Sequence, residues 1–132
     1  MHSEKISVMI PASKQQVFNY IADIKNFPQW ATEFCQELRM DDEHYKVVSP
    51  QGELYLRLQA NPNNGEINLF ATPELNGEEY LPTKVISHND HTSEYVVDFC
   101  HPPGIGEAQF QQQCASIRRE LKNIKFYFES NQ

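Results

Sequence analysis

The sequence predicts an α+β fold in which a curved, mostly antiparallel sheet of seven strands wraps one long carboxy-terminal helix. Two observations support this prediction. Apolar residues recur at steps of three and four from Phe110 to Phe128, which is the spacing of one stripe along a helix. From Phe34 to Cys100 the apolar period is two, with turn residues roughly every ten positions. A helix laid across a curved sheet can enclose a hollow, so we expect one ligand-holding domain over residues 1–132.

The amino-terminal part predicts one strand and two short helices. Residues 6–10 alternate between strongly apolar and less apolar side chains, which indicates a strand buried on one face. Ser13 is a good N-cap, and Gln16 stands three residues later as its capping-box partner, so a helix begins here. The segment 26–32 contains a Pro-x-Trp turn and predicts a second, very short helix.

The remaining strands and the last helix follow from the turn signals. Six strands fit between these turns, mostly joined as antiparallel hairpins, and we place them at 34–40, 44–49, 53–60, 66–72, 80–87 and 93–101. Gly104 and Gly106 allow a tight entry into a helix that we expect to run from Glu107 to Glu129.

Composition and charge exclude several classes of partner. Apolar residues make up 39% of the chain, which is typical of a globular protein. The net charge is 11 − 18 = −7 without any basic run, so neither nucleic acid nor an anionic membrane surface is expected as a partner. No stretch approaches the ~20 apolar residues that span a bilayer, so membrane insertion is not expected.

The cysteines and the amino terminus indicate a cytoplasmic location. The three cysteines, Cys35, Cys100 and Cys114, form no CxxC pair, which suits free thiols in a reducing compartment. The first residues enter a strand pattern directly and contain no apolar block of a signal peptide.

The chain resembles the START-like (SRPBCC) superfamily, which has the helix-grip fold and includes polyketide cyclase/dehydrase-type proteins. The segment Ile10-Pro11-Ala12-Ser13, followed by 24–30 with its Pro-x-Trp turn, is similar to the amino-terminal signature of that superfamily. Residues 99–110, with Pro-Gly before the last helix, are similar to its carboxy-terminal one. The resemblance implies a hydrophobic small molecule, such as a lipid, a polyketide-like or an aromatic compound, held between sheet and helix. It implies no cofactor.

Strand parity selects the residues that would contact such a ligand, because successive side chains alternate between the two faces of a sheet. The more apolar set is expected to face the last helix. We therefore predict a ligand site formed by Trp30, Gln36, Tyr45, Leu56, Leu58, Leu69, Thr83, Tyr95, Phe99, His101, Phe110, Cys114 and Ile117. Among these, Tyr95 and His101 are the weak candidates for proton transfer.

Two other parts of the chain carry residues that could bind a partner or a metal. The opposite face of the sheet carries Tyr55, Phe70, Ile86 and Val96, which indicates a homodimer or another protein contact. The turn 88–91 holds two histidines and an aspartate, but no fourth ligand is identifiable, so no metal site is expected.

Three functions stay open on the sequence alone. The first is non-enzymatic binding of a hydrophobic small molecule in the cavity. The second is a cyclase, aromatase or dehydratase acting in that cavity. The third is a protein-interaction module or homodimer that uses the outer face of the sheet.

Overall fold

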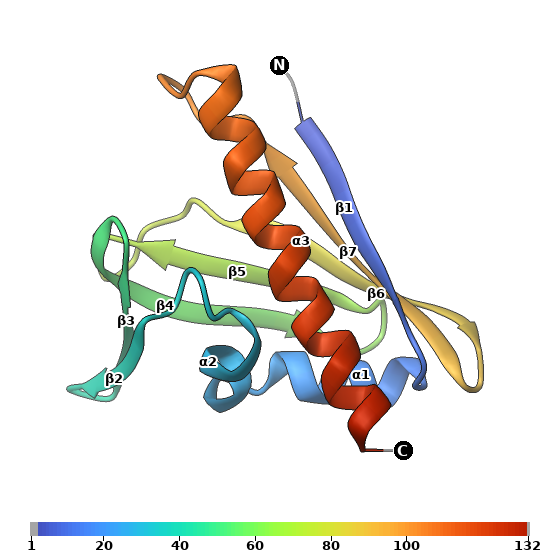
Figure 1. Ribbon diagram of the computed structural model, residues 1–132. Coiled ribbons are helices and arrows are strands. Elements are labelled where there is room, and N and C mark those ends of the chain that lie inside the picture. The colour runs from blue at the N-terminus through green and yellow to red at the C-terminus, as the bar shows by residue number, and fades with distance from the viewer. Residues whose placement is uncertain (1–2, 132) are drawn as a thin grey trace.

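The computed structural model describes residues 3–131 and shows one curved sheet gripping a long helix (Figure 1). The strands are β1 (Ser3–Ile10), β2 (Glu37–Asp41), β3 (His44–Ser49), β4 (Gly52–Asn61), β5 (Glu66–Thr72), β6 (Leu81–Asn89) and β7 (Thr92–Cys100). The helices are α1 (Lys14–Ala22), the 3-10 turn η1 (Ile24–Asn26), α2 (Phe27–Trp30) and α3 (Glu107–Ser130). The predicted fold class is confirmed.

The sheet has seven strands in the order β1-β7-β6-β5-β4-β3-β2, and all neighbours are antiparallel. The first strand therefore lies beside the last, with Ile6 opposite Val97. Helix α3 crosses the sheet and packs on β1, while α2 packs against α3 (Figure 1). Strands β2 and β3 therefore lie at the opposite edge of the sheet, away from α3 (Figure 1).

Helix α1 begins as the sequence predicts. The Ser13 hydroxyl accepts a hydrogen bond from the Gln16 N–H, and the Gln16 side chain accepts one from the Ser13 N–H, both at 3.2 Å. This capping box satisfies two backbone donors that the first turn would otherwise leave unpaired. Helix α1 buries Val17, Phe18 and Ile21 beneath the sheet.

The first predicted strand of the hairpin series starts later than expected. Phe34 was predicted to open it, but β2 begins only at Glu37 and Phe34 lies in a turn. The backbone N–H groups of Glu33 and Phe34 donate to the carboxylate of Glu120 on α3. Because these two N–H groups bond to Glu120, they do not pair with a neighbouring strand. The same bonds hold the segment against α3.

Strand parity is confirmed in the middle of the sheet and fails at its edge. Leu56, Leu69 and Tyr95, all expected on the inner face, are buried. By contrast, Met40, which lies opposite the predicted inner-face residue Tyr45, is 60% exposed, because β2 is the edge strand farthest from β1.

The outer face of the sheet is less apolar at its surface than the sequence indicates. Phe70 is only 6% exposed, because the Tyr80 ring lies 5.1 Å from its ring and the Arg57 guanidinium 3.8 Å from its centroid. The chain therefore covers part of this face itself, while Ile86 remains 38% exposed. Among residues 3–131, no helix combines the length and apolarity needed to cross a membrane.

Candidate functional site

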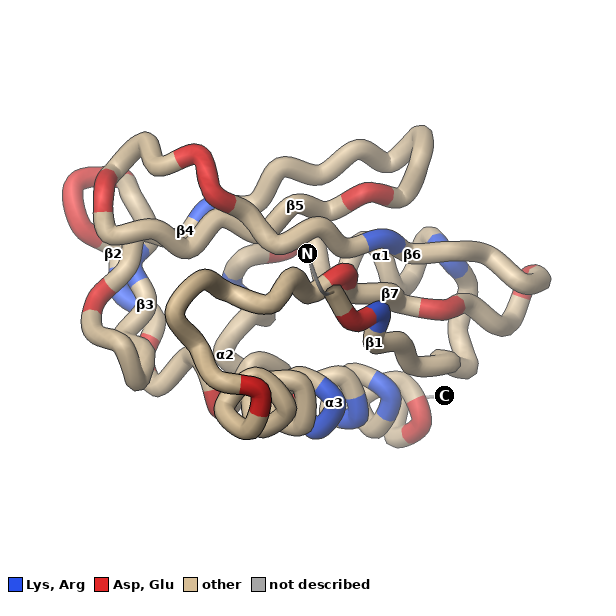
Figure 2. Tube along the Cα trace, turned by 90° about the horizontal axis from the view of Figure 1, so that it is seen from above, with Lys and Arg blue, Asp and Glu red and all other residues tan. Residues whose placement is uncertain are grey.

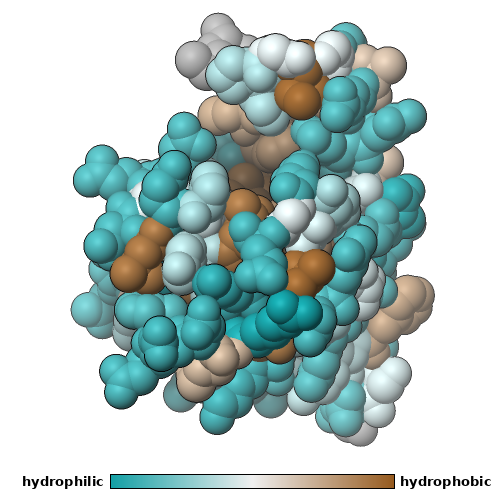
Figure 3. Space-filling model, turned by 90° about the vertical axis from the view of Figure 1, so that its left-hand side faces the viewer, coloured by the Kyte–Doolittle hydropathy of each residue, from teal (hydrophilic) through white to brown (hydrophobic). Residues whose placement is uncertain are grey.

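A cavity of about 260 Å³ lies between the sheet and the helices α2 and α3. Strands β4 to β7 form its floor, and Figure 3 shows hydrophobic residues gathered in a hollowed part of one face, framed by hydrophilic ones. Its apolar lining consists of Phe27, Trp30, Ala31, Phe34, Leu54, Leu56, Leu69, Ala71, Leu81, Val97, Ile117 and Leu121. A cavity of roughly 150 Å³ already holds benzene, so this one can hold a larger molecule.

Three polar residues complete the lining, namely Gln51, Glu79 and Glu120. Gln51 and Glu79 are exposed and belong to the mouth of the cavity, whereas Glu120 is only 6% exposed. No lysine or arginine lines the cavity among the described residues, although basic residues follow one another along α3 (Figure 2). The interior therefore combines apolar walls with one carboxyl group.

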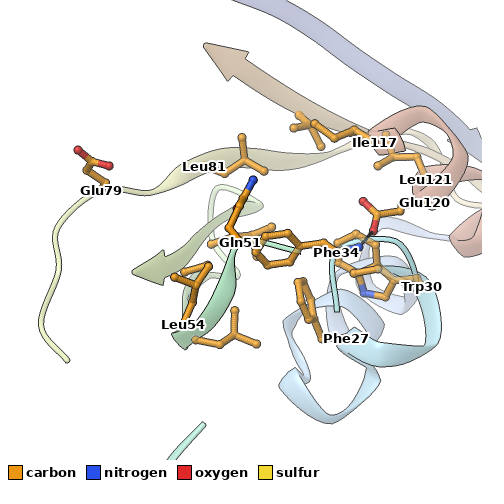
Figure 4. Close-up of a pocket in the computed structure, with 15 residues that line it drawn as sticks. Phe27, Trp30, Phe34, Gln51, Leu54, Glu79, Leu81, Ile117, Glu120 and Leu121 are labelled. Carbon is orange, nitrogen blue, oxygen red and sulfur yellow. Dashed lines mark hydrogen bonds between the residues drawn. The ribbon is translucent and has the colours of Figure 1, made fainter. Parts of the chain in front are cut away.

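The Glu120 carboxyl is held in a defined orientation. Its Oε2 accepts hydrogen bonds from the backbone N–H of Glu33 at 3.1 Å and of Phe34 at 2.9 Å. Figure 4 shows the other carboxyl oxygen directed toward the middle of the cavity. Because both backbone donors occupy Oε2, a proton bound by this carboxyl resides on Oε1.

Burial raises the pKa of Glu120 from 4.5 to about 7, and the negative charge of Glu33 adds to the increase. The two backbone hydrogen bonds act in the opposite direction because they stabilise the carboxylate. The positive charge of Arg119 lowers the pKa of Glu120 only slightly, since its guanidinium binds the Glu33 carboxylate at 2.6 and 2.8 Å instead. Glu120 thus changes its charge near neutral pH.

Three aromatic side chains stand at the Glu120 end of the cavity (Figure 4). The Phe27 ring lies nearly perpendicular to that of Trp30, with centroids 5.2 Å apart, and to that of Phe34, with centroids 6.3 Å apart. Trp30 is 4% exposed, and its indole N–H has no hydrogen-bond partner among the described residues. At this end of the cavity three aromatic rings therefore lie close to the Glu120 carboxyl.

The structure brings together four of the predicted site residues, since Trp30, Leu56, Leu69 and Ile117 line this cavity. Phe99 lines a neighbouring hollow of about 310 Å³ that shares Phe34, Ile117 and Glu120 with the cavity. The remaining predicted residues are elsewhere: Gln36, Tyr45, Leu58, Thr83, Tyr95, His101, Phe110 and Cys114.

Several of these residues belong to the solid part of the core. Tyr95 on β7 and Phe110 and Cys114 on α3 are fully buried where the sheet and the helix meet, and the Thr83 hydroxyl donates to the Ile67 carbonyl at 2.5 Å. Burial raises the pKa of the Tyr95 hydroxyl well above its usual range, so it stays protonated. Tyr95 is therefore no base at physiological pH.

The other predicted residues lie at the surface or near the ends of the sheet. Gln36 is exposed just before β2, and Tyr45 and Leu58 border a separate depression beside η1. The His101 ring stacks on Phe110 with centroids 4.4 Å apart, its Nε2 contacts the Ile105 carbonyl, and its Nδ1 lies 3.6 Å from Glu107. His101 thus organises the entry into α3.

Glu120 is the buried ionisable residue of the cavity that sequence reasoning missed. It stands three positions after Ile117 and four before Ile124, so it interrupts the apolar stripe of the last helix. A carboxylate at such a position is the pattern that would have identified it. Phe27 and Gln51 were missed because they lie in a short helix and a turn, where strand parity does not apply.

Comparison with known proteins establishes the fold. A scan against protein-family models and a search of curated proteins both find no match. Among solved structures, protein XoxI from Bacillus cereus has a TM-score of 0.74 at 17% identity, covering 97% of this chain and 96% of its own. A START superfamily protein from Mycobacterium smegmatis has a TM-score of 0.69 at 12% identity and covers 100% of both chains.

An enzyme is also among the similar structures. The Zhui aromatase/cyclase from Streptomyces sp. R1128 has a TM-score of 0.68 at 12% identity, covering 97% of this chain and 93% of its own. This chain has the START-like helix-grip fold. At such identities the START-like architecture is what is shared, and function has to be argued from the cavity.

Proposed function

We propose that this START-like domain binds a hydrophobic small molecule, such as an aromatic, polyketide-like or lipid-derived compound, in the cavity between sheet and α3. The observation that carries the proposal is an apolar cavity of about 260 Å³ with one interior carboxyl. An apolar pocket with few convergent polar groups is the usual construction of a small-molecule site. Trp30, Leu56, Leu69 and Ile117 are the predicted residues that take part in it.

A dye-binding experiment tests this proposal. Prodan, a neutral naphthalene dye, should increase its emission on binding the wild-type protein. Ala71→Phe places a ring into the cavity and should weaken dye binding about tenfold or more, equal to roughly 1.4 kcal/mol of lost contact. Ala60→Phe is the matched control, because Ala60 is exposed near the end of the neighbouring strand β4 and does not line the cavity. Equal affinities of both folded variants would refute the proposal.

Glu120 supports a second function, in which the cavity catalyses a proton transfer of the cyclase or dehydratase kind. A general acid–base works best when its pKa is near the working pH. The pKa of Glu120, about 7, meets this condition, and its Oε1 faces the cavity. A turnover that disappears in Glu120→Gln while ligand binding remains would favour the enzyme.

Two further properties belong to the same proposal. We place the protein in the cytoplasm, in keeping with the free cysteines Cys35, Cys100 and Cys114. A homodimer through the outer face of the sheet stays a prediction; the exposed part of Ile86 supports it, whereas the cover over Phe70 reduces the apolar area available. Light scattering at high micromolar concentration decides this point, because a strict monomer would contradict it.

A further inference from the structure

The two ends of the cavity differ in chemistry. At one end stand Glu120 and the rings of Phe27, Trp30 and Phe34. Toward the other end Leu54 and Leu81 form aliphatic walls (Figure 4). A ligand that fills the cavity is therefore expected to carry its polar group at one end and an apolar body at the other.

The ionisable side chains in the lining of the cavity are acidic. Among the described residues they are Glu120 and Glu79. The nearest guanidinium on the same helix, that of Arg119, is engaged by Glu33. The whole chain carries a net charge of −7. An anionic ligand would meet repulsion at the interior carboxylate, and none of the described lining residues carries a positive charge to offset it.

A cation, in contrast, finds two kinds of favourable contact at this end. Aromatic faces attract ammonium groups, most strongly when the site is shielded from water. An ionised carboxylate in an apolar interior is unfavourable unless it gains a partner of opposite charge. Glu120 receives two neutral backbone donors on Oε2, and its Oε1 is directed into the cavity. An ammonium group at this end of the cavity would have the Glu120 carboxyl and the rings as neighbours, since all of them line it.

We propose that the ligand of this cavity is an organic amine whose ammonium group lies between Glu120 and the rings of Phe27, Trp30 and Phe34. This inference rests on the proposed binding function and specifies its ligand class. The apolar body of the amine extends along Leu54, Leu69 and Leu81.

Three compounds with the same apolar body test the inference by calorimetric titration at pH 8. They are 4-phenylbutylamine, which is cationic, 4-phenylbutanol, which is neutral, and 4-phenylbutyrate, which is anionic. The amine should bind on the order of tenfold or more tightly than the alcohol, since hydrogen bonds between charged groups are stronger than those between neutral ones. The anion should bind most weakly.

Two variants distinguish the contribution of the Glu120 carboxylate to amine binding from that of the rings. Glu120→Gln should abolish the preference for the amine and leave the affinity for the alcohol nearly unchanged. Glu79→Gln is the control, because this second lining carboxylate is exposed at the mouth and should change the preference little. Phe34→Leu keeps the backbone N–H that binds Glu120 and should reduce the amine preference through loss of one ring.

The outcomes distinguish this inference from the function on which it rests. Equal binding of amine and alcohol, or tightest binding of the anion, would overturn the ammonium site and leave small-molecule binding standing. A preference for the amine that survives in Glu120→Gln would also overturn it. Failure of all three compounds to bind, together with failure of Prodan, would overturn both.

Discussion

Replacing Glu120 by glutamine should make the ligand-free protein more stable above neutral pH. The glutamine oxygen can keep the hydrogen bonds from the N–H groups of Glu33 and Phe34, while the buried charge is removed. The pKa of Glu120 is raised from 4.5 to about 7, chiefly by burial. Between these values the folded chain binds more protons at this position than the unfolded chain, so stability falls as the pH rises.

The magnitude follows from the size of the pKa difference. Each pH unit is worth about 1.4 kcal/mol, so the ionised carboxyl lowers the free energy of unfolding by on the order of 3 kcal/mol at pH 8. The effect is small near pH 4.5 and complete above pH 7. With an unfolding entropy of about 2.1 cal/mol/K per residue, it corresponds to roughly 10 °C in Tm.

The assay is urea unfolding of wild type and Glu120→Gln at pH 4.5 and pH 8. Glu33, Cys35, Arg119 and Tyr95 interact with Glu120, so their coupling to it is part of the measured difference, whereas ionisable groups that do not interact with Glu120 cancel in the comparison. Glu129→Gln is the matched control, because Glu129 is exposed on the same helix. A stability difference between wild type and Glu120→Gln that is the same at both pH values would refute the reasoning.

Three further predictions concern the scaffold. Gly65 and Gly104 have nearly equal positive φ angles of 80° and 79°, but a Cβ on Gly65 would overlap the Val85 backbone oxygen, whereas a Cβ on Gly104 would meet no atom of the described residues within 4 Å. In urea unfolding, Gly104→Ala should lose about 1 kcal/mol from backbone strain, and Gly65→Ala at least about 2 kcal/mol more from the clash; equal losses would contradict this. Ser13→Ala should lose about 1 kcal/mol with its cap, and an unchanged urea midpoint would show that the cap is dispensable. His101→Ala should lower Tm yet keep the Prodan affinity, because His101 does not line the cavity; weaker dye binding would return it to the site.

The main helices and strands could be predicted from local patterns in the sequence. Residues 6–10, the cap at Ser13 and the apolar stripe of α3 each depend on neighbours a few positions away, and each matches an element of the structure. Strand parity likewise placed Leu56 and Leu69 on the cavity wall. These features are local because periodicity and capping act within one helix or strand.

The polar part of the site depends on contacts that no local pattern contains. Glu120 reaches the N–H groups of Glu33 and Phe34, which are 87 and 86 positions away in the chain. Tyr95 and His101 have the right residue types for chemistry, but packing places one in the solid core and the other at the start of α3. Which part of the inner face is hollow follows from three-dimensional packing and cannot be deduced from parity.

Native mass spectrometry of protein purified gently from cells tests most directly whether the cavity holds a ligand. The wild-type protein and Ala60→Phe are expected to carry an additional small-molecule mass that is released on denaturation. Ala71→Phe, purified in the same way and equally folded, is expected to carry none, because its new ring occupies the cavity next to Leu56. Wild-type protein without any bound mass, or the same mass on Ala71→Phe, would contradict the account.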